Sequence, residues 1–422
     1  MHAMGVETTR ALSLVVSAEE TVDRPWYSND GQRPPTVDEA LLIRIAPHLE
    51  RAPPDVKRMA IMELKSQLRN PDVMQAEKCA ITCRVAPSFT RVGHIELHGR
   101  RARKGGKQEL RHLELIARHA LFREYADVDD TSAGLQARVL AMLRECAKRL
   151  SKLVADWLRV GYCQGNFNSD NCLVAGRTMD YGPFGFMERY DPLWNMWVGG
   201  GEHFAFMNQP RAAQRNFASL AKALTPLLDE AGALEAQALV GGFERVCAEA
   251  CNDMWRRKLG LKTWDNDIES MFNELKDLMA ESSVDYTIMW RQLAELPAKG
   301  LTGESPPDTL LEPLREAFYR KLSKSSEDRW SAWLKQWMQR VQAEGAPQEA
   351  AALMRRTSPK YVPREWMLVE AYDAANRGDY GPVRALYGVF ARPFDEQPEV
   401  EGRYYRRAPA SAEERGGTAF MS

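Results

Sequence analysis

Strand-like and helix-like patterns divide the chain into a short front part and a long helical remainder. Runs rich in apolar and β-branched residues at 8–17 and 79–86 predict two strands. Between them, residues 24–77 are rich in turn residues and hold helix-like stretches at 37–49 and 55–68. We interpret 24–77 as an insertion in a strand-to-strand connection, because so long a loop is unusual without structure of its own.

Helical periodicity dominates after Gly93. The pattern predicts an amphipathic helix over 109–125 and a long core helix over 133–159. Further helices are predicted over 208–228, 233–258, 265–278, 285–294, 307–323, 327–343, 347–356 and 364–390. Trp330, Trp333 and Trp337 recur at helical spacing, and we interpret this stripe as core packing rather than a cofactor site.

These elements predict an α+β protein that is mostly α. We divide it into residues 1–93 with the two strands, 94–300 as the domain that carries the candidate chemistry, and 301–400 as a helical extension. The polar tail at 401–422 is predicted to be disordered.

Composition and charge narrow the function classes. The net charge is -1, so no global field attracts nucleic acid or a membrane, and we expect neither as a partner. No apolar run reaches membrane-spanning length, and no targeting segment is visible. The basic stretch at 100–107 is interpreted as a solvated loop.

The seven cysteines show no disulfide framework, which favours a reducing compartment. Cys79 and Cys83 form one close pair, and Cys247 and Cys251 form another. Neither pair is matched by a second Cys or His pair at zinc spacing. We therefore interpret both pairs as buried small hydrophobic residues.

The candidate chemistry lies in CQGNFNSDNCLVAGRTMDYGPFGF, residues 163–186. A calcium loop that starts at Asn166 would need Gly at its sixth position and Glu at its twelfth. Asn171 and Arg177 stand there instead, which argues against an EF-hand.

A magnesium site fits the same stretch better. Mg²⁺ takes few protein oxygens and completes its shell with water and substrate phosphates. Asn171 and Asp180 would suffice if short strands at 173–174 and 178–179 formed a hairpin. Protein kinases hold Mg²⁺ with a catalytic-loop Asn and the Asp of a D-F-G turn, and D-Y-G begins here at Asp180. The alternative is an Asn/Gly-rich turn that only reverses the chain.

Positive charge for phosphate is available in CRVAPSFTRVG, where Arg84 and Arg91 flank a short segment. Arginine suits phosphate oxygens because its guanidinium donates hydrogen bonds in a planar fork. The alternative is two surface arginines at the end of a strand.

Several motifs together resemble the selenoprotein O family of kinase-like protein adenylyltransferases. The family's H-G-x-x-N-T-D-N loop is similar to residues 164–171, and its D-Y-G-P-F-G-F turn matches 180–186. Its R-V-A-x-S-x-x-R-x-G segment matches 84–93. Weaker matches lie at 4–17, 201–210, 359–364 and 404–407, so the resemblance covers most of the chain apart from the insertion.

The resemblance implies roles for named residues. Asp170 would be the general base, Asn171 and Asp180 would hold Mg²⁺ or Mn²⁺, and Arg84 and Arg91 would contact the phosphates of ATP. ATP lies flipped in this family, so AMP is transferred to Ser, Thr or Tyr hydroxyls of protein substrates. The implied architecture is a protein-kinase-like fold with a helical C-lobe and a helical C-terminal extension.

Three departures from the family pattern matter. Gln164 replaces the usual His, and we interpret it as an organiser of the loop. A glycine-rich segment, a Lys and a Glu should precede the first strand, so we expect a truncated N-lobe of which 1–93 is a remnant, with low activity and poor solubility. No cysteine follows Cys251, so the redox disulfide proposed for relatives is expected to be absent.

Two alternative functions stay open: a phosphotransferase of the same fold, and a catalytically inactive pseudokinase that acts as a binding module. The expected compartment is mitochondrial for a eukaryotic source and cytoplasmic for a bacterial one.

Overall fold

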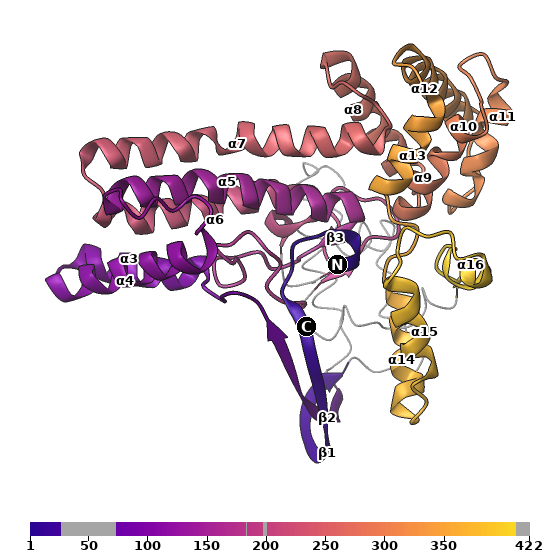
Figure 1. Cartoon of the computed structure of the whole chain (residues 1–422). Coiled ribbons are helices and arrows are strands. Elements are labelled where there is room, and N and C mark those ends of the chain that lie inside the picture. Colours follow the sequence, from indigo (N-terminus) through magenta and orange to yellow (C-terminus); the bar gives the residue numbers. More distant parts are fainter. Residues whose placement is uncertain (27–72, 183, 197–200, 411–422) are drawn as a thin grey trace, which may run out of the picture. The chain divides into compact units, whose positions relative to one another are not determined.

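The structure is a computed structural model that describes residues 1–26, 73–182, 184–196 and 201–410. It is α+β and mostly helical, as predicted (Figure 1). The predicted helices within the 24–77 insertion, at 37–49 and 55–68, lie outside the described residues. No helix in the described ranges is long and apolar enough to cross a membrane.

The chain divides into two compact units, which are described separately. One unit comprises residues 1–12 and 83–407, and the other comprises 13–82 and 408–422. The predicted division at residues 93, 300 and 400 stays a prediction.

Strands β1 (Arg10–Trp26) and β2 (Val73–Val85) form a two-stranded sheet and are longer than the predicted runs. Their apolar side chains Leu14 and Ile81 are exposed. The prediction that Cys79 and Cys83 are buried is wrong, because Cys79 is half-buried and Cys83 is exposed on this strand. The two cysteines are four residues apart on β2 and therefore share one face, and the apolar run fails to bury them because residues 80–82 between them are exposed as well.

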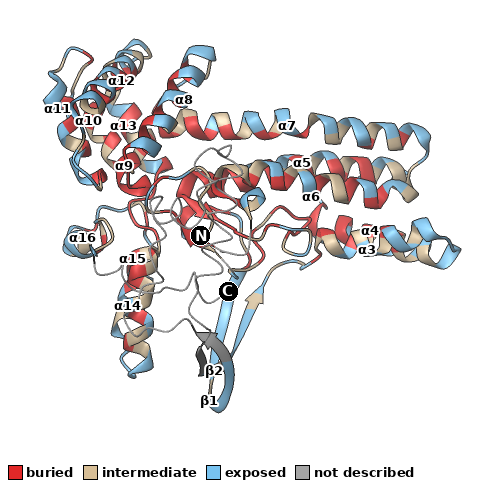
Figure 2. Cartoon of the chain, turned by 180° about the vertical axis from the view of Figure 1, so that it is seen from behind, coloured by how far each residue is buried: buried red, intermediate tan, exposed pale blue. Residues whose placement is uncertain are grey.

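Five helices form the core around the candidate site. They are α3 (Val92–Lys104), α4 (Lys107–Glu124), α5 (Leu135–Val160), α6 (Gln209–Leu224) and α7 (Glu230–Lys258). Helix α5 packs against α6 and α7, while α3 packs against α4 and α6. In Figure 1 they run side by side, and Figure 2 shows that buried residues concentrate in the half of α5 that ends at Val160. This confirms the predicted core helix at 133–159.

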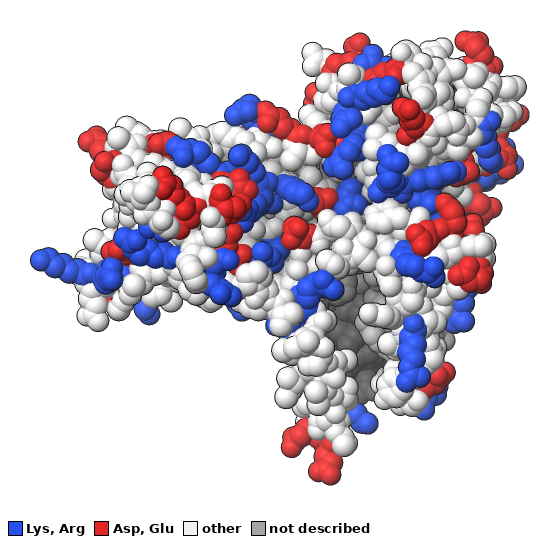
Figure 3. Space-filling view, viewed as in Figure 1, with Lys and Arg blue, Asp and Glu red and all other residues white. Residues whose placement is uncertain are grey.

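The basic stretch at 100–107 differs from its prediction. Residues up to Lys104 continue α3, and only Gly105 and Gly106 form the turn to α4. Its Lys and Arg side chains are largely exposed, and Figure 3 shows blue side chains at this end of the helix pair. The two glycines adopt φ angles of 115° and 112°, which end α3 sharply.

Helices α3 and α6 approach each other at Gly99. A Cβ atom at Gly99 would lie 2.4 Å from the carbonyl oxygen of Ala223, which is backbone and cannot move aside alone. We expect Gly99→Ala to lower the free energy of unfolding by about 1–3 kcal/mol, because overpacking forces the helices apart. Denaturant unfolding followed by circular dichroism measures this. Gly242→Ala in α7 is the control, since a Cβ there meets nothing within 4 Å; equal unfolding midpoints for the two variants would contradict the prediction.

The remaining helices follow the candidate site in the chain. They are α8 (Asn266–Glu281), α9 (Tyr286–Leu293), α10 (Glu295–Ala298), α11 (Pro307–Leu311), α12 (Lys324–Ala343), α13 (Pro347–Thr357), α14 (Glu365–Asn376), α15 (Gly381–Phe390) and α16 (Pro398–Tyr404). Short 3-10 helices occupy His2–Met4, Glu202–Phe204, Phe206–Asn208, Thr225–Leu227 and Glu312–Ala317.

Two of the predicted helices have different limits. The prediction over 307–323 is wrong beyond Ala317, because α11 tightens into a 3-10 helix that ends there. The single helix predicted over 364–390 is two helices in the structure, α14 and α15, which are separated by a turn in which Gly378 has φ +86°. Helix α16 also runs into the segment that is predicted to be disordered, and residues 411–422 lie outside the described ones.

The tryptophan stripe on α12 is core, as predicted. Trp330, Trp333 and Trp337 are all buried. Their indole N–H groups donate hydrogen bonds of 2.8–3.0 Å to Ser282 Oγ and to the carbonyls of Met271 and Leu259. Each buried donor is therefore paired, which is what core packing of tryptophan requires.

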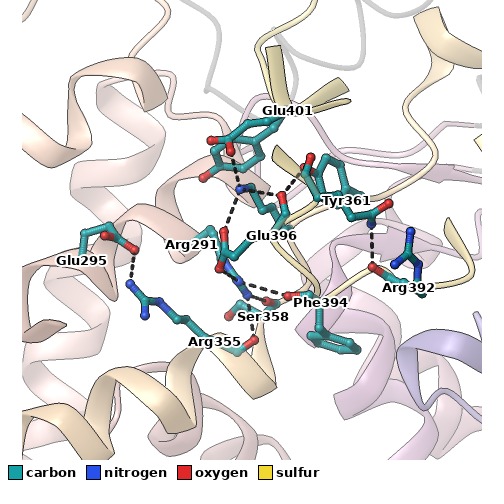
Figure 4. A network of polar contacts seen from close by, with 12 residues as sticks. Arg291, Glu295, Arg355, Ser358, Tyr361, Arg392, Phe394, Glu396 and Glu401 are labelled. Carbon is teal, nitrogen blue, oxygen red and sulfur yellow. Dashed lines mark hydrogen bonds and ion pairs between the residues drawn. The ribbon is translucent and has the colours of Figure 1, made fainter. Parts of the chain in front are cut away.

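The P-K-Y-V-P-R segment at 359–364 anchors the last helices to α9. Buried Arg364 donates two hydrogen bonds, of 2.6 and 2.8 Å, to buried Asp285, and Lys360 forms ion pairs with Glu396 and Glu401. Figure 4 shows Arg291 at the centre of the adjoining network, where it donates to three backbone carbonyls and to Glu396. These contacts give the P-K-Y-V-P-R segment a structural role.

Glu188 lies beside this anchor, and its shifted pKa predicts that the stability of the protein depends on pH. Burial raises the pKa of Glu188 to about 7 from its usual 4.5, although Arg364 acts in the opposite direction. Because the folded-state pKa lies above the unfolded one, the stabilising contribution is full below pH 4.5 and lost as the pH rises through about 7.

Relative to Glu188→Gln, the wild-type free energy of unfolding should fall over this pH range by at most about 3 kcal/mol. Urea unfolding of both proteins from pH 4.5 to 8 measures the difference. A difference that does not change with pH would show that Glu188 titrates normally.

Candidate functional site

The Asn/Asp stretch is the connection between two short paired strands that follow the core helix. Helix α5 ends at Val160 and is followed by Gly161, which has φ +77° and packs so closely against Tyr286 that a Cβ would lie 2.8 Å from its ring. Strand β3 (Tyr162–Cys163) then pairs antiparallel with β4 (Gly185–Phe186). Both ends of the intervening loop are therefore held at the same place in the core.

The first half of the loop is ordered by its own asparagines. Asn168 Oδ1 accepts the backbone N–H groups of Asp170 and Asn171 at 3.0 and 3.2 Å. Asn171 Nδ2 donates to the Asn166 carbonyl at 2.8 Å, which leaves Asn171 Oδ1 as the oxygen that can face a cation. From α6, Asn216 donates to the Phe167 carbonyl at 2.9 Å and ties the loop to the helix.

A single bridge brings the two halves of the loop together. Cys172 pairs antiparallel with Thr178 around a turn in which Gly176 has φ +69°. The short strands expected at 173–174 and 178–179 are thus reduced to this bridge. Asn171 directly precedes this bridge and Asp180 follows it by two residues, so both predicted metal ligands lie at the open end of the hairpin.

The R-V-A segment packs on the loop and starts α3 beside Asp170. Backbone hydrogen bonds join Val92 N to Cys172 O and Gly93 N to Ser169 O, both at 2.8 Å. A Cβ at Gly93 would lie 2.2 Å from Asp170 Oδ1, so the carboxylate lies against the first turn of α3. Negative charge is favoured at a helix N-terminus by the exposed N–H groups.

The two predicted carboxylates are available for chemistry. Asp170 is exposed and Asp180 is half-buried. Within the described residues, no hydrogen bond or ion pair engages either carboxylate. A carboxylate that has no internal partner can accept a proton or a cation without first breaking a contact.

The predicted phosphate-binding arginines both adjoin the loop but differ in their contacts. Arg84 Nε donates to Thr9 Oγ1 at 2.7 Å, and its guanidinium lies 5.0 Å from the ring centre of Tyr181 in the D-Y-G turn. Thr9 therefore already takes up part of the hydrogen-bonding capacity of the Arg84 guanidinium. Arg91 pairs with Leu173 through an isolated bridge, and its buried Nε has no hydrogen-bond partner in the described chain.

Gln164 is buried and tied into the base of the loop. Its backbone N–H donates to Gln209 Oε1 at 3.0 Å, and its side chain accepts the Tyr162 hydroxyl. Gln209 Nε2 in turn donates to the carbonyls of Tyr162 and Phe206. Sequence reasoning did not assign Gln209 a role; the only signal was its place in the motif at 201–210.

The described site is thus an oxygen-rich hairpin loop beside two arginines, in a mostly helical protein. Comparison with known proteins identifies the family. The family model described as Protein adenylyltransferase SelO matches residues 54–390.

The chain therefore belongs to this family of nucleotidyltransferase enzymes, as its motifs predicted. Relatives named Protein nucleotidyltransferase YdiU match over the whole chain. The protein from Azoarcus sp. (strain BH72) is 34% identical, with 70% of its length covered. The protein from Xanthomonas campestris pv. campestris (strain B100) is 30% identical with 70% covered, and that from Rhodopirellula baltica is 30% identical with 71% covered.

Proposed function

We propose that this protein transfers AMP from ATP to Ser, Thr or Tyr hydroxyls of other proteins. The observation that carries the proposal is the hairpin loop in which Asp170, Asn171 and Asp180 lie around one bridge, in a chain that belongs to an adenylyltransferase family. The part of the chain around this loop would have the layout of a kinase C-lobe, in which a core helix leads into the catalytic loop.

The residues of the loop fit a magnesium or manganese ion. Asn171 offers Oδ1, because its Nδ2 is held by Asn166, and Asp180 offers a carboxylate. These are oxygen donors only, which suits a hard cation that completes its shell with phosphate oxygens and water. When bound, such an ion would neutralise the triphosphate and orient it.

Asp170 would act on the attacking hydroxyl. Its exposed carboxylate can accept a hydrogen bond from a substrate side chain and then the proton of that hydroxyl. The hydroxyl oxygen bonds to the α-phosphorus, the bond to the bridging oxygen breaks, and pyrophosphate leaves. Arg84 and Arg91 would stabilise the charge on the phosphates. The support for Arg91 is that its Nε has no hydrogen-bond partner among the described residues, whereas Arg84 already donates to Thr9.

The test uses ATP labelled separately at the α- and γ-phosphate. The chain is incubated with each label, Mg²⁺ or Mn²⁺ and a protein extract, and labelled protein is detected after electrophoresis. Transfer of the α-label alone supports the proposal. Transfer of the γ-label alone would mean a phosphotransferase, and transfer of neither, with ATP still bound, would favour a binding module.

A further inference from the structure

A second group of metal-ligating side chains lies away from the Asn/Asp loop, between α3 and α4. It consists of His98 on α3 with Glu109 and His112 on α4, and one ligand atom from each lies within 4.8 Å of the others. Glu109 and His112 are three residues apart and so share one face of α4, which packs against α3.

We propose that His98, Glu109 and His112 bind a divalent first-row transition metal ion, and that this ion is Zn²⁺. Two imidazoles and one carboxylate are a ligand set that zinc uses, with a fourth position left for water. The Asn/Asp loop offers oxygens alone, so the two sites select different ions.

The geometry is close to what the ion requires. His112 Nδ1 and Glu109 Oε2 lie 3.7 Å apart. Tetrahedral zinc with bonds of about 2.0–2.2 Å places its ligand atoms about 3.4 Å apart. The pair on α4 is therefore nearly in place, and half-buried His98 completes a set in which all three ligand atoms lie within 4.8 Å of one another.

Two atoms of the cluster also lack a hydrogen-bond partner. His98 Nδ1 and Glu109 Oε2 are buried and form no hydrogen bond with any described residue. Buried polar atoms are nearly always paired, and a shared metal ion would satisfy both.

The ion would fasten α3 to α4 a short way from the candidate catalytic loop. His98 follows Gly93 by five residues, or about 7.5 Å along the helix axis. Gly93 is the residue against which Asp170 lies. A metal clamp at His98 would thus hold the helix end that supports Asp170, without itself touching the loop.

The test is a zinc titration of the full chain after removal of metal with a chelator. Bound zinc is counted by elemental analysis after gel filtration, and affinity is obtained by competition with a chromogenic chelator. We expect one ion per chain, and binding at least about 100-fold weaker in His98→Ala and His112→Ala, because even changes behind a ligand cost 10–100-fold. His119 is an exposed histidine on α4, and the His119→Ala variant should bind zinc as tightly as the wild type does.

Glu109→Gln tests the site independently if the alanine variants misfold, since it keeps the shape of the side chain and removes only its charge. It should weaken binding while leaving the circular dichroism spectrum unchanged. Cobalt in place of zinc distinguishes the ligands, because exposed Cys83 could also bind metal. No retained zinc, equal affinity in all variants, or a cobalt spectrum with thiolate bands would overturn the proposal.

Discussion

Asp180→Ala should abolish AMP transfer, with a fall in kcat of at least about 10²–10³-fold. On the proposed function, Asp180 supplies one of two protein oxygens to the cation that neutralises the triphosphate. The bridge between Cys172 and Thr178 joins the two halves of the loop that carry Asn171 and Asp180, and Asp170 has a different proposed role as the base. Transfer of the α-label to protein, at saturating ATP and Mg²⁺, measures the effect.

The structure also predicts what Asp180→Ala leaves intact. Because no described residue forms a hydrogen bond or ion pair with the Asp180 carboxylate, Tm should hardly change. Asp328→Ala is the matched control, since this exposed aspartate on α12 only pairs with Lys324 one helical turn away. If Asp180→Ala retained wild-type transfer, the assignment of this loop as the metal site would be wrong.

Long helices could be predicted from the sequence because their apolar stripes are long and regular. The ranges predicted for α5, α7 and α12 agree with the structure to within a few residues. The single helix predicted over 364–390 failed for a local reason. Gly378 adopts a left-handed conformation and Asp379 Oδ1 accepts the Gly381 N–H at 2.8 Å, so a turn interrupts a pattern that stays helical on both sides.

Only those features of the candidate site that depend on residues close together in the sequence could be predicted. The spacing of Asn171 and Asp180 indicated a hairpin, and the structure has a bridge at that point. The packing of Gly93 against Ser169 and Asp170 has no local signal, because these residues are more than seventy positions apart. The His98–Glu109–His112 cluster was missed for the same reason, since it forms only when α3 and α4 pack together.

The close contact at Gly93 predicts that Gly93→Ala lowers kcat by about 100-fold without unfolding the protein. The new Cβ would lie 2.2 Å from Asp170 Oδ1 and 3.3 Å from the Ser169 carbonyl oxygen, so the carboxylate must turn away from its position. A displacement of about 1 Å at a reacting group can cost about 10²-fold in rate. The helix itself tolerates alanine well, so the free energy of unfolding should be unchanged or slightly higher.

Steady-state kinetics separate this effect from a general loss of binding. We expect kcat to fall while KM for ATP stays nearly constant, because the metal and phosphate ligands are other residues. Gly134→Ala is the control, since Gly134 precedes α5 and a Cβ there meets nothing within 4 Å. A fall in kcat equal to that of the control would mean that Asp170 does not depend on this contact.

A double-mutant cycle then assigns the effect to Asp170. If Gly93→Ala acts by displacing the Asp170 carboxylate, it should cause no further loss of kcat in a protein that already carries Asp170→Ala. If the two losses multiply instead, the alanine acts through the path of α3 and not through the carboxylate. In that outcome the backbone hydrogen bond from Gly93 to Ser169 would be what orders the loop, and Asp170 would no longer be the residue that this contact positions.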